Sequence, residues 1–443
     1  MTVVDPLREG RGDPQAVALI GPERVWTYGD LDRAVDPRAD ALRGSGRRAG
    51  QVVPLVVDAD ADCVIGLLAL WRIGATPAPL NAKLTEPERE AARATLEHAP
   101  VGAQAILWTS GTAGRPRGVV ISSDALRASA HGAAERLGLG THDVWLASLS
   151  PAHIGGLALI TRALLLGSSL VAVGPFDAAR TWGLVHGRGL PAGVAAPVTH
   201  VSLVPTQLLR LLDVSGGESP PPSFRCALVG GAGTPSDLLA RALATGWPVA
   251  LTYGLTEATS QVATASPEQT RLKPGSVGRR LAGVSVRIGE DDEILVRGAT
   301  LASGYVGQGV GPMVDAEGWH PTGDMGRLDA EGDLWVIGRR ADRIVSGGVT
   351  IDAVEVEEAL RSHAAVADAC VVGLADPEWG ERVAAWIEPA GGAPDLKALD
   401  AYLRARLAAP KLPRRYHVQP HLPRNANGKV DRAAVREVLS RSG

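Results

Sequence analysis

The chain has 443 residues, more than one hydrophobic core normally serves, so two or three domains are expected. Hydrophobic residues make up 45% and charged residues 21%, a balance that is typical of a folded globular protein and excludes a largely disordered one. The net charge of −3 provides no basic field for nucleic-acid binding, no apolar stretch is long enough to span a bilayer, and no signal sequence is recognisable. We therefore expect a cytoplasmic protein with no nucleic-acid partner and no membrane span.

Strand and helix patterns alternate along the first half of the chain. The β-branched run QVVPLVV at 51–57 is followed by an apolar helix pattern at 63–72, and AILW precedes a Gly-rich turn and a helix pattern at 126–137. Further on, CALVGGAG at 226–233 precedes a helix pattern at 236–244. This alternation predicts an α/β fold in which helices pack on a largely parallel sheet.

The pattern changes after Pro274. The short β-type runs VSVRI, EILVRG and DLWVIG are separated by glycines and acidic turns, which predicts an antiparallel β subdomain. Beyond GRRAD, helix patterns at 353–361 and 396–407 accompany the strand patterns ACVVGL and RVAAWIEP. We therefore expect a large N-terminal domain over residues 1–340 and a small α+β domain over residues 341–443.

The segment TSGTAGRPRG at 109–118 combines three glycines with hydroxyl and basic side chains. Such a loop can present backbone N–H groups, hydroxyls and cations to a polyphosphate. The GxxxxGK[ST] spacing of a Walker loop is absent. Taken alone, an ordinary surface turn explains the segment equally well.

Four further motifs carry polar groups that a nucleotide could use. In TYGLTE the glutamate could hold Mg²⁺ while Thr256 contacts phosphate, and the alternative is a helix N-terminus capped by Thr256. Asp324 in TGD offers a carboxylate for ribose hydroxyls, and Arg339 in GRRAD offers a cation for phosphate or ribose. Lys429 in NGKVDR sits in a loop that could deliver a cation. Each is an ordinary turn or a solvated charge when considered alone.

Taken together and in this order, the motifs resemble the acyl-adenylating superfamily of acyl-CoA synthetases, peptide-synthetase adenylation domains and luciferases. The resemblance extends from WTYGDL at Trp26 to Lys429. It implies ATP, Mg²⁺ and coenzyme A as ligands, with an adenine contact at 230–232, a ribose aspartate at Asp324 and a metal ligand at Glu257. The residues that it assigns to nucleotide or coenzyme A are Thr109, Ser110, Gly111, Thr112, Arg115, Arg117, Gly230, Gly231, Ala232, Thr252, Tyr253, Gly254, Asp324, Arg339, Gly347 and Gly348.

The same resemblance implies two reactions at one site. Lys429 is the implied adenylation lysine, and its cation helps the acid's carboxylate attack the α-phosphorus of ATP. The small C-terminal domain is expected to be mobile, to withdraw Lys429 by rotation, and to bring the loop with Gly347 to the acyl-AMP for attack by a thiol. The residues expected to act in catalysis are Lys429, Glu257, Thr256 and His153.

Two parts of the chain depart from the family pattern. Arg115 and Arg117 occupy places in the phosphate loop where lysines are usual, and a guanidinium retains the capacity to bind phosphate. Ala341 stands in the expected hinge, where relatives often carry Asp or Lys. The pivot residue therefore stays open.

The acid is indicated by the segments between the ATP motifs. His153 in PAHIGGL is expected to form a wall of the acyl pocket. The run SLVPTQLLRLL at 202–212 resembles the ligases that make o-succinylbenzoyl-CoA in menaquinone synthesis, whose acid carries a second carboxylate. The polar residues expected around that acid are Ser202, Thr206, Gln207 and Ser260. Alternatively, Thr206 and Gln207 only cap the following helix.

The implied partners are a small carboxylic acid, ATP and coenzyme A, and a homodimer is left open. A different aryl- or acyl-CoA ligase, or a stand-alone adenylating enzyme that loads a carrier protein, would keep the same ATP motifs. A catalytically silent relative would only bind nucleotide. The joint presence of Thr112, Glu257, Asp324, Arg339 and Lys429 favours an enzyme.

Overall fold

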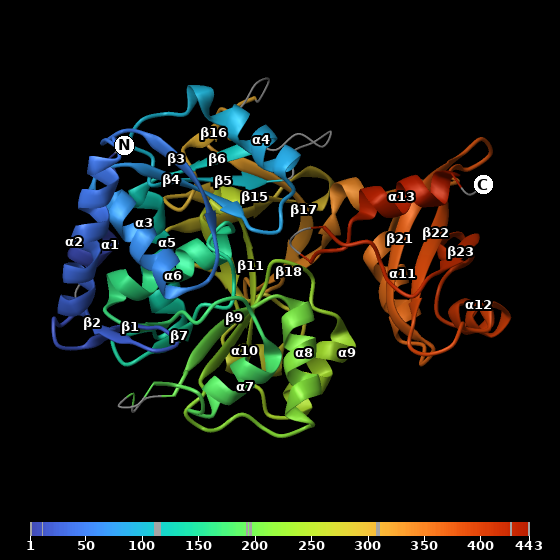
Figure 1. Cartoon of the computed structure of the whole chain (residues 1–443). Helices are drawn as coiled ribbons and strands as arrows, with labels where there is room; N and C mark the ends of the chain where they lie inside the picture. The colour runs from blue at the N-terminus through green and yellow to red at the C-terminus, as the bar shows by residue number, and fades with distance from the viewer. Residues whose placement is uncertain are drawn as a thin grey trace.

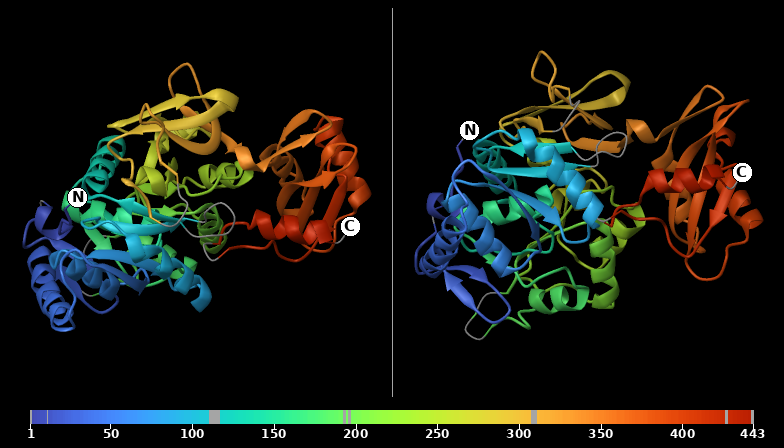
Figure 2. Two further views of the ribbon diagram at one scale, coloured as in Figure 1. Left: turned by 90° about the horizontal axis from the view of Figure 1, so that it is seen from above. Right: turned by 45° about the horizontal axis from the view of Figure 1, so that its top comes forward.

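The chain forms a main body, which extends to Arg339, and a C-terminal part, which begins at Arg343 and lies to one side of the main body (Figure 1). Both views of Figure 2 show the same arrangement. The structure is a computed structural model that describes residues 2–10, 12–109, 117–191, 194, 197–306, 311–425 and 428–441. None of the helices in these ranges is both long and apolar enough to cross a membrane.

The main body is built around a sheet to which nine of the described strands belong. The strand order is β13-β12-β11-β10-β9-β7-β8-β1-β2, and all neighbours from β11 to β1 pair in parallel. Antiparallel pairs complete both ends, so the predicted, largely parallel sheet is confirmed. The bounds are β1 (Val17–Ile20), β2 (Val25–Thr27), β7 (Val144–Leu146), β8 (Ser169–Val171), β9 (His200–Leu203), β10 (Cys226–Val229), β11 (Val249–Leu255), β12 (Ser260–Thr264) and β13 (Arg279–Arg280).

Apolar clusters cover both faces of this sheet, as strand β10 shows. Cys226 and Leu228 belong to one buried cluster, whereas Ala227 and Val229 belong to another. Because successive side chains of a strand point to opposite faces, both faces must be covered. The helices of the main body are α1 (Pro6–Glu9), α2 (Tyr28–Gly44), α3 (Ala61–Arg72), α4 (Glu86–Ala94), α5 (Ser123–Leu137), α6 (Ile154–Leu166), α7 (Ala178–Val185), α8 (Pro205–Ser215), α9 (Ser236–Ala244) and α10 (Pro267–Leu272).

Local capping fixes where these helices begin and end. The Asp60 side chain accepts a hydrogen bond from the Cys63 N–H at 2.8 Å, so α3 begins two residues before the predicted apolar pattern. The Ser122 hydroxyl accepts from Ala125 N–H at 3.1 Å at the start of α5. Gly138 ends α5 with a φ of 64°, a left-handed conformation that glycine adopts without strain.

Smaller sheets complete the described main body. Strands β3 and β4 pair in parallel, and β5, β6 and β16 form an antiparallel sheet. Strands β14, β15, β17 and β18 form a second antiparallel sheet, which confirms the subdomain expected after Pro274. The bounds are β3 (Val52–Val57), β4 (Thr76–Asn81), β5 (Ala105–Thr109), β6 (Arg117–Ile121), β14 (Val284–Ile288), β15 (Glu293–Gly298), β16 (Gly304–Val306), β17 (His320–Leu328) and β18 (Leu334–Arg339).

The C-terminal part has a sheet and an apolar core of its own. Strands β20, β19, β22 and β21 pair in that order, with β23 parallel to β22, and a buried cluster that includes Ile344, Val356 and Leu399 packs against them. The expected boundary near Ala341 falls in the turn Arg340–Asp342, which joins β18 to β19. The bounds are β19 (Arg343–Ser346), β20 (Val349–Asp352), β21 (Val366–Asp376), β22 (Gly380–Pro389), β23 (Arg415–Val418), α11 (Ala353–Arg361), α12 (Leu396–Arg404) and α13 (Arg432–Arg441).

Helix α12 is shorter than the pattern at 396–407 predicts. It ends at Arg404, and the N–H groups of Arg406 and Leu407 both donate to the Leu403 carbonyl in a tight turn. Leu407 is still packed against the apolar core, so its hydrophobicity does not mark another helical turn.

Candidate active site

A cleft of about 1390 Å³ lies at the carboxyl ends of the parallel strands β7, β9, β10 and β11. Ligands of open α/β sheets commonly bind in this position. The volume exceeds that of a pocket for one drug-sized ligand, so the cleft can hold a nucleotide and a small acid together. The residues of the C-terminal part that line it are Glu388, His421, Leu422, Arg424, Gly428 and Lys429.

Asp324 is the centre of a polar cluster behind the cleft wall. The register of β17 and β18 places it opposite Arg339, whose Nε lies 3.0 Å from Asp324 Oδ1. The Tyr253 hydroxyl donates to Asp324 Oδ2 at 2.8 Å. Burial raises the pKa of Asp324, against the opposing effects of Arg339 and Tyr253. Residues from TYGLTE, TGD and GRRAD therefore meet at one buried carboxylate.

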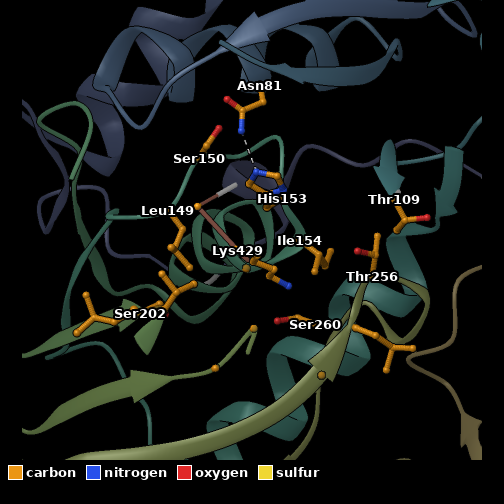
Figure 3. A pocket seen from close by; sticks show the side chains of 18 of the residues that line it. Asn81, Thr109, Leu149, Ser150, His153, Ile154, Ser202, Thr256, Ser260 and Lys429 are labelled. Carbon is orange, nitrogen blue, oxygen red and sulfur yellow. Dashed lines mark hydrogen bonds between the residues drawn. The ribbon is translucent and has the colours of Figure 1, made fainter. Parts of the chain in front are cut away.

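Lys429 enters the cleft from a tight loop between β23 and α13. Asn425 shapes this loop: its N–H donates to the Lys429 carbonyl at 2.8 Å, and its side-chain oxygen accepts from the Lys429 N–H at 3.1 Å. The lysine side chain lines the cleft, as do those of Ser260 and Thr256 (Figure 3). Its pKa is lowered although the residue remains open to the cleft, first because surrounding protein desolvates the ammonium and then because Arg339 repels it.

Glu257 is a second buried carboxylate, only 8% exposed, in the single turn Thr256–Ala258 that follows β11. The turn continues into β12 rather than into a longer helix, so Thr256 does not act as the cap of an α-helix. Tyr305 on β16 donates to Glu257 Oε1 at 3.2 Å. Arg117 stacks over the Tyr305 ring, with its Cζ 5.0 Å from the ring centre. The Glu257 carboxylate is therefore tied to the strand that follows the expected phosphate loop.

The residues around Glu257 fit a magnesium–polyphosphate group. Thr109 Oγ1 and Arg117 Nε are buried and have no hydrogen-bond partner among the described residues. Together with Glu257 they supply a hydroxyl, a cation and a carboxylate, which is the donor set that such a group requires. The other expected phosphate-loop residues, Ser110, Gly111, Thr112 and Arg115, lie outside the described residues.

An unusual backbone turn places Ser260 in the cleft. Thr259 and Ser260 have φ angles of 50° and 93°, in the left-handed region that non-glycine residues rarely adopt. Across β11 and β12, a Cβ at position 254 would lie 1.8 Å from the Ser260 carbonyl oxygen, so Gly254 is required by this close approach. Other predicted residues that line the same wall are Thr252, Gly230 and Gly231.

The opposite wall of the cleft carries His153. His153 directly precedes α6, and its Nε2 lies 3.0 Å from the Asn81 side-chain nitrogen (Figure 3). Leu149 and Ser150 lie beside it in the loop after β7. An apolar and polar wall of this kind can contact a planar acid on one face.

Ser202, Thr206 and Gln207 also line the cleft, but Gln207 has a structural task as well. Its Oε1 accepts from the Val204 N–H at 3.1 Å, and its Nε2 donates to the Ser148 carbonyl at 3.3 Å. Gln207 therefore caps α8 and ties it to the loop after β7, as the alternative interpretation of the sequence expects. These two hydrogen bonds reduce its capacity to bind a substrate.

Arg162 lines the cleft and was not predicted from the sequence. It lies on α6, is 3% exposed, and donates through Nη1 to Gln261 Oε1 at 2.8 Å. Its Nε is buried without a partner among the described residues. Burial lowers its pKa to about 10, so it is still a cation at neutral pH. The available signal was an arginine inside the otherwise apolar helix IGGLALITRALLL, because buried cations are rare unless they are paired or functional.

Besides Tyr253 and Asp324, which lie behind the cleft wall, three further predicted residues among the described ones do not line the cleft. Ala232 is exposed just beyond Gly231. Gly347 and Gly348 form the turn between β19 and β20, on the C-terminal part. Gly347 has a φ of 57°, and a Cβ there would lie 2.7 Å from the Trp379 ring. The turn therefore packs closely against Trp379 while Lys429 occupies the cleft.

Two family models match this chain. Residues 8–101 and 94–306 match the AMP-binding enzyme family, and residues 355–429 match the AMP-binding enzyme C-terminal domain. In an alignment 472 positions long, the chain is 32% identical to a 2-succinylbenzoate–CoA ligase of Bacillus cereus. The match covers 96% of each of the two chains.

Solved structures with the same fold cover almost the whole chain. The o-succinylbenzoate CoA synthetase of Bacillus subtilis, in complex with its acyl-adenylate intermediate, is 29% identical and superposes with a TM-score of 0.87 over 99% of this chain and 98% of that one. The same enzyme in complex with ATP and a magnesium ion gives a TM-score of 0.86 at 29% identity, over 98% and 99% of the two chains.

Proposed function

This chain belongs to the AMP-binding enzyme family, and we propose that it joins 2-succinylbenzoate to coenzyme A at the expense of ATP, a step of menaquinone biosynthesis. One observation carries the choice of acid. The cleft is lined by the buried cation Arg162 in addition to Lys429, so it offers a partner for an anionic group that takes no part in the reaction. A diacid such as 2-succinylbenzoate has this second carboxylate.

The first reaction is adenylation of the acid. A carboxylate oxygen of the acid attacks the α-phosphorus of ATP, and the bond from this phosphorus to the oxygen that bridges the α- and β-phosphates breaks. Pyrophosphate leaves, and the acyl-AMP anhydride remains. Lys429 would stabilise the negative charge that develops on the phosphate oxygens, and Thr256 would donate to them. Asp324 would accept hydrogen bonds from the ribose hydroxyls. When bound, Mg²⁺ would neutralise phosphate charge, and Glu257 is the residue placed to hold it.

Arg162 is proposed to bind the carboxylate that does not react. A guanidinium forms charge-assisted hydrogen bonds to a carboxylate, often two in parallel, and such bonds are strong in a buried site. Gln261, which already contacts Arg162, and Ser260 lie on the same side of the cleft. His153 would contact the acid from the opposite wall.

The second reaction transfers the acyl group to sulfur. The thiol of coenzyme A loses its proton to solvent and attacks the acyl carbonyl, and AMP leaves. Lys429 lines the cleft and Gly347 does not, an arrangement that supports a role of Lys429 in the first reaction of the proposed mechanism. For the second reaction we propose a rotation of residues 341–443 about the turn Arg340–Asp342.

An exposed ion pair at this turn is weak enough to break during turnover. Arg340 Nη2 lies 2.7 Å from Asp291 Oδ2, and both side chains are more than half exposed. An exposed pair of this kind contributes about 0–1 kcal/mol, so it biases the position of the C-terminal part without locking it.

Pyrophosphate release from ATP and Mg²⁺ tests this proposal. Purified protein is incubated with 2-succinylbenzoate, benzoate, medium-chain fatty acids or amino acids, each with and without coenzyme A. Selective release with 2-succinylbenzoate, followed by its coenzyme A thioester, is the expected result. Release with another acid alone would overturn the choice of substrate, and thioester formation only on a carrier protein would overturn the choice of acceptor. No release with any acid would indicate a silent nucleotide binder.

A further inference from the structure

Arg162 rests on a stack of two aromatic rings that do not line the cleft. Its guanidinium carbon lies 4.5 Å from the centre of the Trp145 indole. The Trp145 indole also stacks on the His200 ring, with 4.7 Å between the ring centres and 28° between the ring planes. Trp145 is completely buried and His200 is 1% exposed. Neither ring reaches the cleft, so neither can contact a substrate directly.

The sheet register explains why the two rings meet. Trp145 on β7 and His200 on β9 are paired residues of neighbouring parallel strands. Paired side chains point to the same face of a sheet at strand spacing, which brings flat rings into contact. Helix α6 carries Arg162 and places its guanidinium over the Trp145 ring.

The His200 ring is held in place by residues of the strands and loops around it. The Thr199 hydroxyl lies 2.7 Å from His200 Nδ1 and accepts from the Val144 N–H at 2.8 Å. Burial, with smaller effects of Arg225 and Arg162, lowers the pKa of His200 to about 3, so the ring is neutral at physiological pH. A neutral imidazole supports the indole without adding a charge that would repel Arg162.

We propose that Trp145 and His200 form a support for Arg162. This support fixes the Arg162 guanidinium where the acid would bind in the cleft, and thereby sets the preference for acids with a second carboxylate. The inference rests on the proposed function, because it assigns that carboxylate to Arg162. Trp145 and His200 are positioning residues, since they act through Arg162.

The contacts of Arg162 explain why such a support is needed. Gln261 holds only one of its terminal nitrogens, and Nε has no partner among the described residues. A long side chain that is held at only one point loses rotamer freedom when a ligand binds, and this loss weakens binding. A side chain that is already held in place loses less. The face of an indole is the best aromatic surface for a cation, so Trp145 keeps the guanidinium in one plane before the acid arrives.

The test compares diacid and monoacid substrates in variants of Trp145. Trp145→Phe keeps a smaller ring, and Trp145→Leu removes the aromatic face. The diacid is 2-succinylbenzoate, and the monoacids are 4-oxo-4-phenylbutanoate, which lacks the ring carboxylate, and 2-butanoylbenzoate, which lacks the chain carboxylate. The monoacid that the wild-type protein adenylates serves as the reference. Pyrophosphate release gives KM and kcat for each pair.

Trp247 provides a matched control. Like Trp145, it is completely buried, stacks on another ring and has an indole N–H without a partner among the described residues, but it does not line or approach the cleft wall. Trp247→Phe and Trp247→Leu therefore report the effect of a smaller buried side chain alone. Thermal melting establishes that each variant is folded.

We expect the KM for 2-succinylbenzoate to rise about threefold in Trp145→Phe and about tenfold in Trp145→Leu, with kcat unchanged. The KM for the monoacid should stay within about twofold of wild type, and the Trp247 variants should leave both KM values unchanged. An unchanged diacid KM in folded Trp145→Phe, or an equal rise for both acids, would overturn the inference. Wild-type protein without activity on 2-succinylbenzoate would overturn the proposed function as well.

Discussion

Replacing Arg162 with methionine should separate substrate binding from stability. Methionine keeps an unbranched apolar stem but removes the guanidinium. In the proposed complex, the non-reacting carboxylate of the acid would then be buried without its partner. Loss of one member of a buried ion pair costs about 2–5 kcal/mol, so kcat/KM for 2-succinylbenzoate should fall by about thirtyfold or more.

The stability of the free protein should change little. Burial lowers the pKa of Arg162 to about 10, and this decrease corresponds to a cost of about 3 kcal/mol for keeping the charge buried. Arg162→Met removes this cost but also removes the hydrogen bond to Gln261, worth about 1.5–3 kcal/mol, and the contact with Trp145, worth about 1 kcal/mol. These contributions nearly cancel, so the melting temperature should stay within about 4 °C of wild type.

Arg136→Met is the matched control for this experiment. Arg136 on α5 is half-buried, whereas Arg162 is buried. Like Arg162 it contacts a glutamine, Gln269, and it donates through Nε to the Thr264 carbonyl at 2.7 Å, but it does not line the cleft. Its loss should lower stability and leave KM unchanged. Unchanged selectivity in Arg162→Met, measured by pyrophosphate release with the diacid and the monoacid, would refute the role of Arg162. A large fall in its melting temperature would refute the stability argument.

Three further predictions concern the nucleotide and the second reaction. Lys429→Ala should slow acyl-AMP formation about 10²–10³-fold but leave thioester formation from supplied acyl-AMP nearly intact, which single-turnover kinetics measures. Because burial raises the pKa of Asp324, the KM for ATP should rise as the pH falls through that pKa and the carboxylate loses its charge. The variant Asp324→Asn should have a high KM for ATP at every pH. A KM that rises with falling pH in the variant as it does in the wild-type protein would contradict this prediction. Gly347→Val would bring a side chain against Trp379 in a left-handed conformation, so it should slow the thioester reaction and spare adenylation; equal loss of both rates would argue against a separate role for this turn.

Much of the fold follows from local patterns in the sequence. The alternation of β-branched runs and helix patterns predicts the largely parallel sheet, because its central strands, such as β10, are buried on both faces. The acidic and Gly-rich turns after Pro274 predict the antiparallel sheet. The expected boundary near Ala341 and the roles of the site residues stay predictions, as do the cytoplasmic location and the homodimer.

The site was harder to predict, because its contacts join distant segments. Asp324 and Arg339 were expected to bind nucleotide separately, and only the register of β17 and β18 reveals that they form one ion pair. Arg162 on helix α6 was missed because its partners Gln261 and Trp145 lie on the strands β12 and β7, away from the helix in the sequence. Helix periodicity shows which face is apolar, but it cannot show that a cation on that face meets an indole and a cleft.

The order of strands in the central sheet has a consequence for synthesis of the chain. Leu19 on β1 pairs with Leu170 on β8, so the hairpin of β1 and β2 lacks its parallel partner until β8 has also been translated. At elongation rates of about 5–20 residues per second this delay is roughly 10–30 seconds. During that interval the apolar edge of β1 is open to chaperones or to other nascent chains. We therefore expect the yield of folded protein, rather than its final stability, to depend most on expression temperature and chaperone supply.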